Sequence, residues 1–429
     1  MQPSIDVQGF RLSPQQKRLW ALQQTFGAAY AQGILAIDGV LDRPRLERSV
    51  EAAVARHEAL RTLFCREPGV KVPLQVIAED GRPAWDVVDV EAVGAAARAA
   101  RRDDILKEHR RQLVDWDRGP LFRCTLCRLS DRTHWLLISL PAMCADARTL
   151  RNLAAEIAAG YGADASSESA EEPVQYAQFA EWQNELLADE EAAKGRQFWR
   201  EVLADPATVT LPFERTAHSV DTTSGWPAET LAWDLDAGVA ASLLTLSERR
   251  GTPVEALVLA AWQTVLWRVG GRRTFLMALL GDGRKYDELE SGMGLFAKWM
   301  PLRCRIDPDR SFQDLADSVE SDQSRAREWQ EYLAWESEAD AAGAATSELV
   351  GFEFESGGPL AHTGDVLFSF ETVSVRFEPL KLNLVCTKRG RSIRLCLQAE
   401  PGSVHSAALP VLGEAVTALL AGAAAEPDT

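Results

Sequence analysis

Histidine is scarce in this sequence, and no histidine stands in a pattern that performs chemistry. The 429 residues include six histidines, namely His57, His109, His134, His218, His362 and His405. None is followed four residues later by aspartate, and no two have the spacing of metal ligands. A Gly-x-Ser-x-Gly elbow, a phosphate-binding loop and a dinucleotide-binding fingerprint are also missing. Motif patterns alone therefore lead no further than a large soluble protein of the α/β class.

Cysteine is present but forms no recognisable framework. There are seven cysteines, an odd number, and the single Cys-x-x-Cys runs from Cys124 to Cys127. The surrounding LFRCTLCRL has the pattern of a strand, in which an offset of three sends two side chains to opposite faces. Because no second cysteine pair completes a zinc site, we expect reduced cysteines and no bound metal.

Long apolar runs and an excess of positive charge are also absent. No apolar run reaches the roughly 18 residues of a membrane span, and the first residues lack the apolar core of a signal peptide. We therefore expect a cytoplasmic protein that does not enter a membrane. The formal net charge of −17 argues against a nucleic-acid surface. The basic run 98–111 is typical of a solvated helix face, with a local patch for an acidic partner as the alternative.

The order of patterns predicts two lobes of mixed α and β structure. Asp42 and Pro44 suit the N-cap and first turn of a helix, whose apolar positions keep helical spacing to Leu60. The small, acidic stretch 162–174 cannot pack and is the expected linker. We therefore place an N-terminal lobe at 1–170 and a C-terminal lobe, with elements crossing to the first, at 171–429.

Periodicity places the remaining elements within these lobes. In the first lobe it predicts strands at 33–41, 121–129 and 134–140, the last two as a hairpin, and helices at about 94–114 and 147–160. In the second lobe it predicts helices at 176–203, 252–269 and 408–421, and strands at 274–280, 299–306, 364–371, 381–387 and 392–398. The helix at 252–269 is apolar on nearly all sides and is therefore expected in a core.

Several segments share their order and spacing with one known family. They are LSPQQKRLWAL (12–22), ARHEALRTLF (55–64), DWDRGPLFRCTLCRL (115–129), YAQFAEW (176–182), GDGRKYDELESGMGLFAKWMPLR (281–303) and DVLFSFE (365–371). Together these segments resemble the condensation domains of nonribosomal peptide synthetases, over about residues 10–421.

The resemblance implies both a fold and a kind of partner. The fold has two chloramphenicol-acetyltransferase-like lobes in a V shape, each a mixed sheet flanked by helices, with a central tunnel between them. Members of the family receive substrates on the phosphopantetheine arms of peptidyl or acyl carrier proteins. The resemblance therefore implies carrier proteins as partners and no cofactor bound to the chain itself.

The catalytic signature of that family is altered here. The register of His-His-x-x-x-Asp-Gly falls on Pro141, Ala142, Met143, Cys144, Ala145, Asp146 and Ala147, so only the aspartate remains. In the family, the second histidine positions or deprotonates the acceptor amine that attacks a donor thioester. Ala142 has no heteroatom for either task. Pro141 also replaces the first aspartate of cyclising relatives, so the signature assigns no catalytic residue here.

Asp146 has two structural interpretations. The resemblance implies an ion pair with Arg284 of the Gly-Arg motif, which would clamp the signature loop across the lobes. The position of Asp146 also suits the N-cap of the helix that begins at 147. Both roles are structural and they can coexist.

Three other residues are candidates to line the tunnel beside Ala142. The family's Asn-Thr pair falls on Lys298 and Trp299. Lys298 either enters the tunnel, as a cation or as a base of lowered pKa, or extends to solvent. Trp299 either narrows the tunnel or packs in the core. Cys144 is either a nucleophile, which needs a base or cation nearby, or a small buried thiol.

Two functions follow from this altered signature. We favour a condensation-like domain that docks carrier-bound substrates without normal condensation chemistry, as a scaffold or as a recruiter of a tailoring enzyme. Relatives with altered signatures that recruit oxygenases are the precedent. The alternative is an unconventional acyltransferase that joins a thioester donor to a nucleophile without the histidine, since orientation alone supplies about 7–11 kcal/mol. A decayed module is the third possibility.

Overall fold

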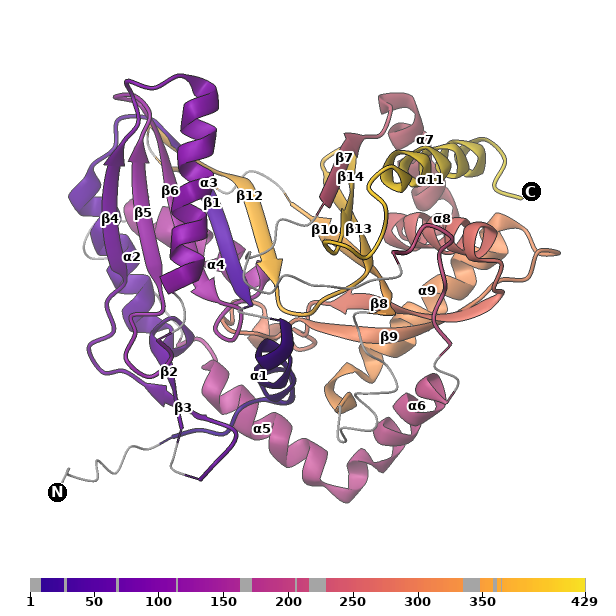
Figure 1. Ribbon diagram of the computed structural model, residues 1–429, viewed down its shortest axis with the longest axis horizontal. Helices are drawn as coiled ribbons and strands as arrows, with labels where there is room; N and C mark the ends of the chain where they lie inside the picture. The colour runs from indigo at the N-terminus through magenta and orange to yellow at the C-terminus, as the bar shows by residue number, and fades with distance from the viewer. Residues whose placement is uncertain are drawn as a thin grey trace. The chain divides into compact units, whose positions relative to one another are not determined.

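The computed structural model describes residues 9–26, 29–66, 69–112, 115–162, 172–204, 207–215, 229–334, 348–357, 361–363 and 365–428, which form two compact units (Figure 1). The first unit contains Met1–Ala188, Asp282–Ala297 and Pro359–Phe377. The second contains Asp189–Gly281, Lys298–Gly358 and Glu378–Thr429. Each unit is therefore built from segments that are far apart in the sequence.

A six-stranded sheet is the centre of the first unit. Its order is β11-β12-β1-β6-β5-β4, and neighbouring strands are antiparallel except for the parallel pair β4 and β5. The strands are β1 (Tyr30–Asp38), β4 (Ala84–Asp89), β5 (Arg123–Arg128), β6 (Thr133–Pro141), β11 (Ala361–Thr363) and β12 (Val366–Arg376). The last two strands come from late in the chain, so this sheet is completed by a distant segment.

Helices cover both faces of this sheet, as two adjacent residues of β1 demonstrate. The side-chain amide of Gln32 donates to the carbonyl of Leu106 in α3 (Ala95–Gln112), at 2.9 Å. A Cβ added to Gly33 would lie 3.8 Å from Leu150 in α4 (Ala147–Gly162). Because neighbouring residues of a strand point to opposite faces, α3 and α4 lie on opposite sides of the sheet. The remaining elements of this unit are α1 (Pro14–Phe26), α2 (Arg43–Arg56), η1 (Glu58–Arg61), β2 (Thr62–Cys65), β3 (Leu74–Ile77), α5 (Tyr176–Ala188) and η3 (Asp287–Leu289).

The second unit has its own six-stranded sheet. The order is β7-β14-β13-β10-β8-β9, with β10 parallel to both of its neighbours and the other pairs antiparallel. The strands are β7 (Glu229–Asp234), β8 (Thr274–Gly281), β9 (Lys298–Arg305), β10 (Val350–Ser356), β13 (Leu382–Arg389) and β14 (Ser392–Ala399). The helical elements are η2 (Glu190–Ala192), α6 (Ala193–Leu203), α7 (Ala237–Arg250), α8 (Val254–Gly270), α9 (Phe312–Glu328), η4 (Gln330–Tyr332) and α11 (Ala408–Ala425). Both units are therefore mixed sheets flanked by helices, as the resemblance implies.

Helix α8 is the central helix of the second unit. Its residues from Ala256 to Leu266 are all buried, which explains why its sequence is apolar on nearly all sides. Trp262 is fully buried, and its indole N–H donates to the carbonyl of Gly351 at 3.1 Å. The prediction of a core helix at 252–269 is confirmed.

Other local predictions are also confirmed where the chemistry is local. Asp42 accepts a hydrogen bond from the Arg45 N–H at 3.0 Å, and Pro44 lies in the first turn of α2. The hairpin predicted at 121–140 is the antiparallel pair β5 and β6. Helix α4 (Ala147–Gly162) matches the helix predicted at 147–160 and ends two residues later.

The single long helix predicted at 176–203 is wrong. The structure has α5, then the short η2, then α6. Asp189 adopts an extended backbone (φ −71°, ψ 148°), and its side chain accepts from the Glu191 N–H at 2.7 Å. Such a local hydrogen bond competes with helix continuation and starts a new turn instead. The chain also passes from the first unit to the second at this residue.

The division between lobes at 170 and 171 stays a prediction. The expected linker at 162–174 lies mostly outside the described residues, because 163–171 are not described. Helix α5, which follows them, belongs to the first unit.

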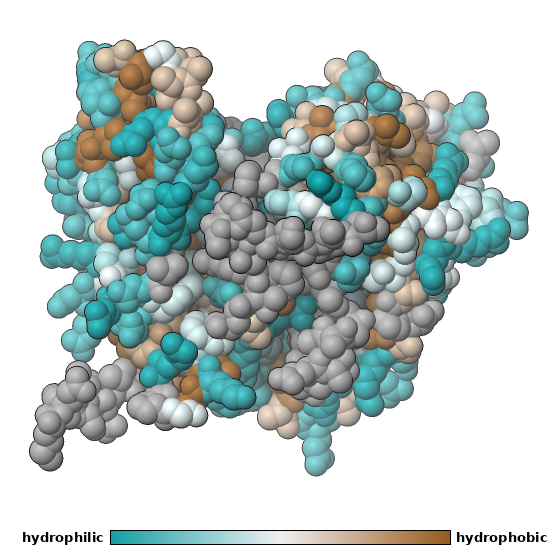
Figure 2. Space-filling view, in the orientation of Figure 1, coloured by the Kyte–Doolittle hydropathy of each residue, from teal (hydrophilic) through white to brown (hydrophobic). Residues whose placement is uncertain are grey.

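Helix α11 is the one described helix whose length and composition would allow it to cross a membrane. It packs beside α7 and α8, and it buries Leu409, Leu412, Val416 and Leu420 in the core of the second unit. Apolar residues remain on its outer side, such as Val411 at 65% exposure, and apolar surface is visible at this helix in Figure 2. A partly buried helix of this kind is ordinary for a core element, so composition alone assigns it no membrane role.

Candidate functional site

The altered signature forms a tight turn between β6 and α4. Every residue from Pro141 to Asp146 is buried. The Ala142 N–H donates to the carbonyl of Ala29 at 3.2 Å, and the Cys144 N–H donates back to the Pro141 carbonyl at 2.9 Å. The turn is therefore ordered by its own backbone and by the start of β1.

Sequence motifs that are far apart meet around this turn. The side-chain amide of Gln16 donates to the Met143 carbonyl at 2.9 Å. Ser13 Oγ lies 2.8 Å from the hydroxyl of Tyr176, which donates to the Leu295 carbonyl at 2.6 Å. Ser13 and Gln16 belong to LSPQQKRLWAL, Tyr176 to YAQFAEW and Leu295 to the segment 281–303. Reasoning from the sequence named these motifs but did not assign their residues to the support of the turn.

At the position that the family resemblance aligns with the catalytic histidine, Ala142 carries only a methyl group. The Ala142 side chain is fully buried and has no atom that can accept or donate a proton. The thiol of Cys144, two residues on, lies 4.0 Å from the Thr62 carbonyl. Burial raises the pKa of this thiol far above its ordinary value. Because the thiolate is the nucleophilic form, the surroundings favour a small buried thiol over a nucleophile.

Arg284 lies against Asp146 in a fully buried, two-point ion pair. Its Nη1 is 2.9 Å from Asp146 Oδ2 and its Nη2 is 3.0 Å from Asp146 Oδ1, with side-chain exposures of 1% and 0%. Nη1 also donates to Asp282 Oδ1 (2.8 Å), and Nη2 donates to the Gly292 carbonyl (3.0 Å). The guanidinium carbon lies 4.4 Å from the centre of the Phe296 ring. Both terminal nitrogens of the guanidinium group are therefore hydrogen-bonded, and the group also lies against the Phe296 ring.

The carboxylate of Asp146 is satisfied just as fully. Its Oδ1 accepts from the Thr149 N–H at 2.7 Å, which is the hydrogen bond of an N-cap to α4. Its Oδ2 accepts from the backbone N–H groups of Phe296 and Ala297, each at 3.0 Å. The ion-pair and N-cap interpretations of Asp146 thus describe one arrangement. Both partners belong to the first unit, so the pair joins the signature turn to the segment Asp282–Ala297 within that unit.

This arrangement determines the ionisation of Asp146. Burial alone would raise the pKa of the carboxyl group, but the charge and hydrogen bonds of Arg284 and the backbone N–H groups of Thr149 and Ala297 outweigh it. The pKa of Asp146 therefore lies below its ordinary value, and the group is a carboxylate at neutral pH.

Lys298 and Trp299 open strand β9 in the second unit. Lys298 Nζ lies 3.2 Å from Glu331 Oε2 and 3.4 Å from the Gln330 carbonyl, and both charged side chains are buried. The expectation that Lys298 extends to solvent is therefore wrong. Its ammonium group stays buried because Glu331 supplies a buried counter-charge. Burial lowers the pKa of Lys298 although Glu331 opposes the shift. Trp299 is also buried, at 6% exposure.

Two buried histidines of the first unit, His57 and His109, are engaged with partners other than Asp146. His57 Nε2 lies 2.7 Å from Glu156, on the helix pair α2 and α4. His109 is buried between two hydroxyl groups, Ser139 and Thr125, and burial lowers its pKa to about 4. His218 lies outside the described residues. No group of described residues has the composition of a metal site either.

The charges of the basic run 98–111 are largely used within α3 and its surroundings. Arg98 donates to carbonyls at the start of the helix, Arg102 pairs with Glu371, and Arg110 donates to Gln32. These contacts favour the interpretation of an ordinary helix face over a patch for an acidic partner.

The comparisons with known proteins agree with this geometry. The family model for the condensation domain matches residues 8–336. The chain therefore belongs to the condensation-domain family.

Relatives of the chain are peptide synthetases. Phosphinothricin tripeptide synthetase PhsC of Streptomyces viridochromogenes is 31% identical over 317 residues, which cover 72% of this chain and 28% of that protein. Chondramide synthase cmdD of Chondromyces crocatus is 29% identical over 323 residues, which cover 74% of this chain and 8% of that protein. The chain thus spans a small part of these relatives.

Solved structures with the same fold cover nearly the whole chain. The condensation domain of the Monacolin K polyketide synthase MokA has a TM-score of 0.82 and 18% identity, with 98% of each chain covered. The X-domain from teicoplanin biosynthesis, in complex with OxyB, has a TM-score of 0.79 and 24% identity, with 98% of this chain and 94% of that chain covered. At these identities the likeness shows the fold.

We expect Asp146→Ala to destabilise the chain by about 3–5 kcal/mol, because it leaves the buried charge of Arg284 without its main partner. Asp282→Ala is the matched control, since it removes the half-exposed carboxylate from the same guanidinium and should cost under about 1 kcal/mol. Urea denaturation of the full-length chain measures both. Equal costs for the two variants would contradict the dominance of the buried pair.

Acid should remove the contribution of Asp146. Because folding lowers the pKa of this carboxyl, its contribution is fully present above the ordinary carboxyl pKa and is lost as the pH falls through the folded-state pKa. We therefore expect the free energy of unfolding to fall more steeply on acidification in the unaltered chain than in Asp146→Ala. Parallel curves of unfolding free energy against pH would show that this group does not titrate as described.

Gly283, next to Arg284, should not tolerate a side chain. Its φ is +76°, and an added Cβ would lie 1.9 Å from the carbonyl oxygen of Phe296. Gly390 is the matched control, because its φ is +56° and an added Cβ would meet nothing within 4 Å. We expect Gly390→Ala to cost about 1–2 kcal/mol, the backbone term alone. Gly283→Ala should cost more than about 4 kcal/mol or prevent folding. Thermal unfolding compares them, and similar melting temperatures would contradict the close approach.

Proposed function

We propose that this condensation domain docks substrates tethered to carrier proteins without performing normal condensation, and that it serves as a scaffold or recruiter of a tailoring enzyme or another partner. One observation carries the proposal. A buried methyl group, Ala142, occupies the register of the acid–base residue, while the ion pair of Asp146 and Arg284 that holds the turn is present.

Within the signature turn, Cys144 is a poor substitute for the missing base, because burial raises the pKa of its thiol. Lys298, in the second unit, is already paired with Glu331. Removal of general-base help typically slows a reaction about 10²–10⁴-fold, whereas the contribution of orientation remains. A site of this kind is suited to holding a substrate and is poorly suited to turning it over.

The family supports carrier proteins as partners. Condensation domains act on substrates presented on phosphopantetheine, so we propose that holo carrier proteins bind this chain and that it carries no cofactor of its own. Because the chain spans a small share of its synthetase relatives, adjacent synthetase domains are further proposed partners.

A structural neighbour supports the recruiting role. The X-domain from teicoplanin biosynthesis was solved in complex with OxyB, so this fold can bind a second protein. We transfer only that kind of role to the present chain, since the shared feature is the fold.

A reconstitution tests the proposal. A donor carrier protein loaded with an acyl thioester and an acceptor loaded with an aminoacyl thioester are mixed with the full chain. Calorimetry should detect carrier binding, and intact-protein mass spectrometry should detect no more transfer product than without the chain. A condensation domain that keeps both signature histidines, given the same carriers, is the positive control.

Two results would overturn the proposal. Product formed by the unaltered chain and retained in Ala142→Ser would establish an acyltransferase that works without the histidine. Failure of either carrier protein to bind, with the positive control active, would remove the docking role.

A further inference from the structure

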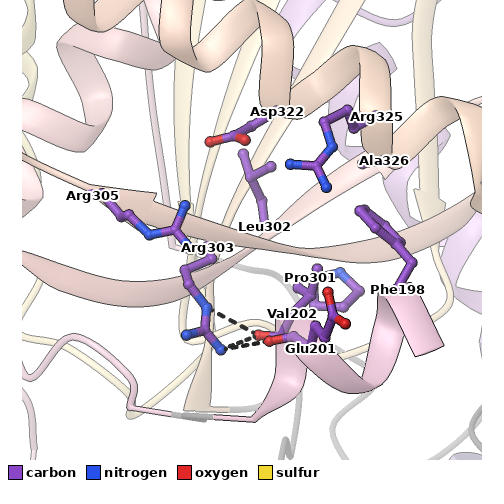
Figure 3. Close-up of a pocket in the computed structure, with 10 residues that line it drawn as sticks. All are labelled: Phe198, Glu201, Val202, Pro301, Leu302, Arg303, Arg305, Asp322, Arg325 and Ala326. Atoms are coloured by element: carbon purple, nitrogen blue, oxygen red, sulfur yellow. Dashed lines mark hydrogen bonds between the residues drawn. The ribbon is translucent and has the colours of Figure 1, made fainter.

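The second unit contains a cavity of about 200 Å³ that the preceding site does not use (Figure 3). Residues of three elements line it, namely the C-terminal half of α6, the edge strand β9 and the C-terminal half of α9. Pro301, Leu302 and Ala326 give the cavity an apolar part. Its other walls carry ionisable side chains.

Arg303 fixes the wall that α6 contributes. Its Nη2 donates to the carbonyls of Glu201 and Val202, at 3.0 and 2.6 Å, as the dashed lines of Figure 3 show. These carbonyls belong to the last turn of α6, where backbone acceptors lack the usual partner four residues on, although the Glu201 carbonyl also accepts from the Ala204 N–H at 3.4 Å. The guanidinium therefore joins α6 to β9 through its Nε and Nη2 and holds this wall of the cavity.

Three other charged groups of the cavity are not used in this way. Among the described residues, the guanidinium groups of Arg305 and Arg325 and the carboxylate of Asp322 have no hydrogen bond or ion pair. The guanidinium carbon of Arg325 lies 5.3 Å from the centre of the Phe198 ring. The carboxylate of Glu201 also lines the cavity, and it accepts from the side-chain amide of Gln197 at 2.9 Å. Two exposed guanidinium groups and two carboxylates thus share the cavity without a direct ion pair between them.

This combination selects against simple ions. An anion would be attracted by Arg305 and Arg325 but repelled by the carboxylates of Asp322 and Glu201. A cation would be attracted by the two carboxylates but repelled by the two guanidinium groups. A ligand with both charges satisfies both kinds of group. We propose that the cavity binds a small zwitterion with an apolar side chain, of which a free α-amino acid is the simplest, with its carboxylate at Arg305 and Arg325 and its ammonium group at Asp322.

The surroundings of Asp322 are consistent with this assignment. Burial raises the pKa of its carboxyl group, and the more distant charges of Arg305 and Arg325 do not cancel the shift. A bound ammonium group would stabilise the carboxylate. Binding of the zwitterion should therefore weaken as the pH falls and Asp322 becomes protonated.

Three related probes test the proposal on the full-length chain. They are L-leucine (both charges), N-acetyl-L-leucine (anion only) and L-leucinamide (cation only), each measured by calorimetry and saturation-transfer NMR at millimolar concentration. We expect L-leucine to bind about tenfold or more tightly than either derivative, because each charge-assisted hydrogen bond lost costs about that factor.

Variants then assign the binding to this cavity. Arg305→Gln and Arg325→Gln should each weaken L-leucine binding about tenfold, and Asp322→Asn should abolish the preference for L-leucine over N-acetyl-L-leucine. Arg310→Gln and Asp309→Asn, which alter charges outside the cavity lining, are matched controls and should leave binding unchanged. Equal binding of the three probes, no binding of any, or binding insensitive to the cavity variants would overturn the proposal. None of these outcomes bears on carrier-protein docking.

Discussion

The buried carboxylate of Asp146 is the constraint on which the signature turn depends. A charge removed from water is stable only when other groups replace its hydration, and here two guanidinium nitrogens and three backbone N–H groups do so. These donors come from Arg284, from the first turn of α4 and from the end of the segment Asp282–Ala297. Because they are fixed by a single side chain, the turn, the helix and the distant segment take one arrangement.

Within this short motif, the position aligned with the catalytic residue and the residue that holds the turn in place are therefore different. A proton-transfer group at the register of Ala142 would add a reactive atom to the turn but would not be needed to hold it, since Ala142 contributes only its backbone N–H to the hydrogen-bond network. Asp146 has the opposite role, because its carboxylate holds the turn together. Its ion pair with Arg284 keeps it ionised at neutral pH, so it does not take up a proton there. A chain can lose the first residue and keep the geometry that the second one enforces.

The sequence was informative where the cause is local. Asp42 and Pro44 start α2, the apolar surface of α8 requires burial, and β5 and β6 are adjacent in both sequence and sheet. It was uninformative where the cause is a partner far along the chain. No pattern around Lys298 indicates its contact with Glu331. The break after α5 is a different case, because its cause, the hydrogen bond to the Asp189 side chain, is local and was overlooked. The pairing of Asp146 with Arg284 was accessible only through family resemblance, because 138 positions separate them.

The first unit takes its last pieces from Asp282–Ala297 and Pro359–Phe377. During synthesis on a ribosome, β1 therefore has an unpaired edge until β12 emerges. Asp146 likewise has no ion-pair partner until Arg284 has been synthesised. Most of the intervening chain belongs to the second unit, which can begin to fold while the first is still incomplete. An expression clone cut near residue 170 would carry an open sheet edge and an uncompensated buried carboxylate, so it would be prone to aggregate and would not be an isolated lobe.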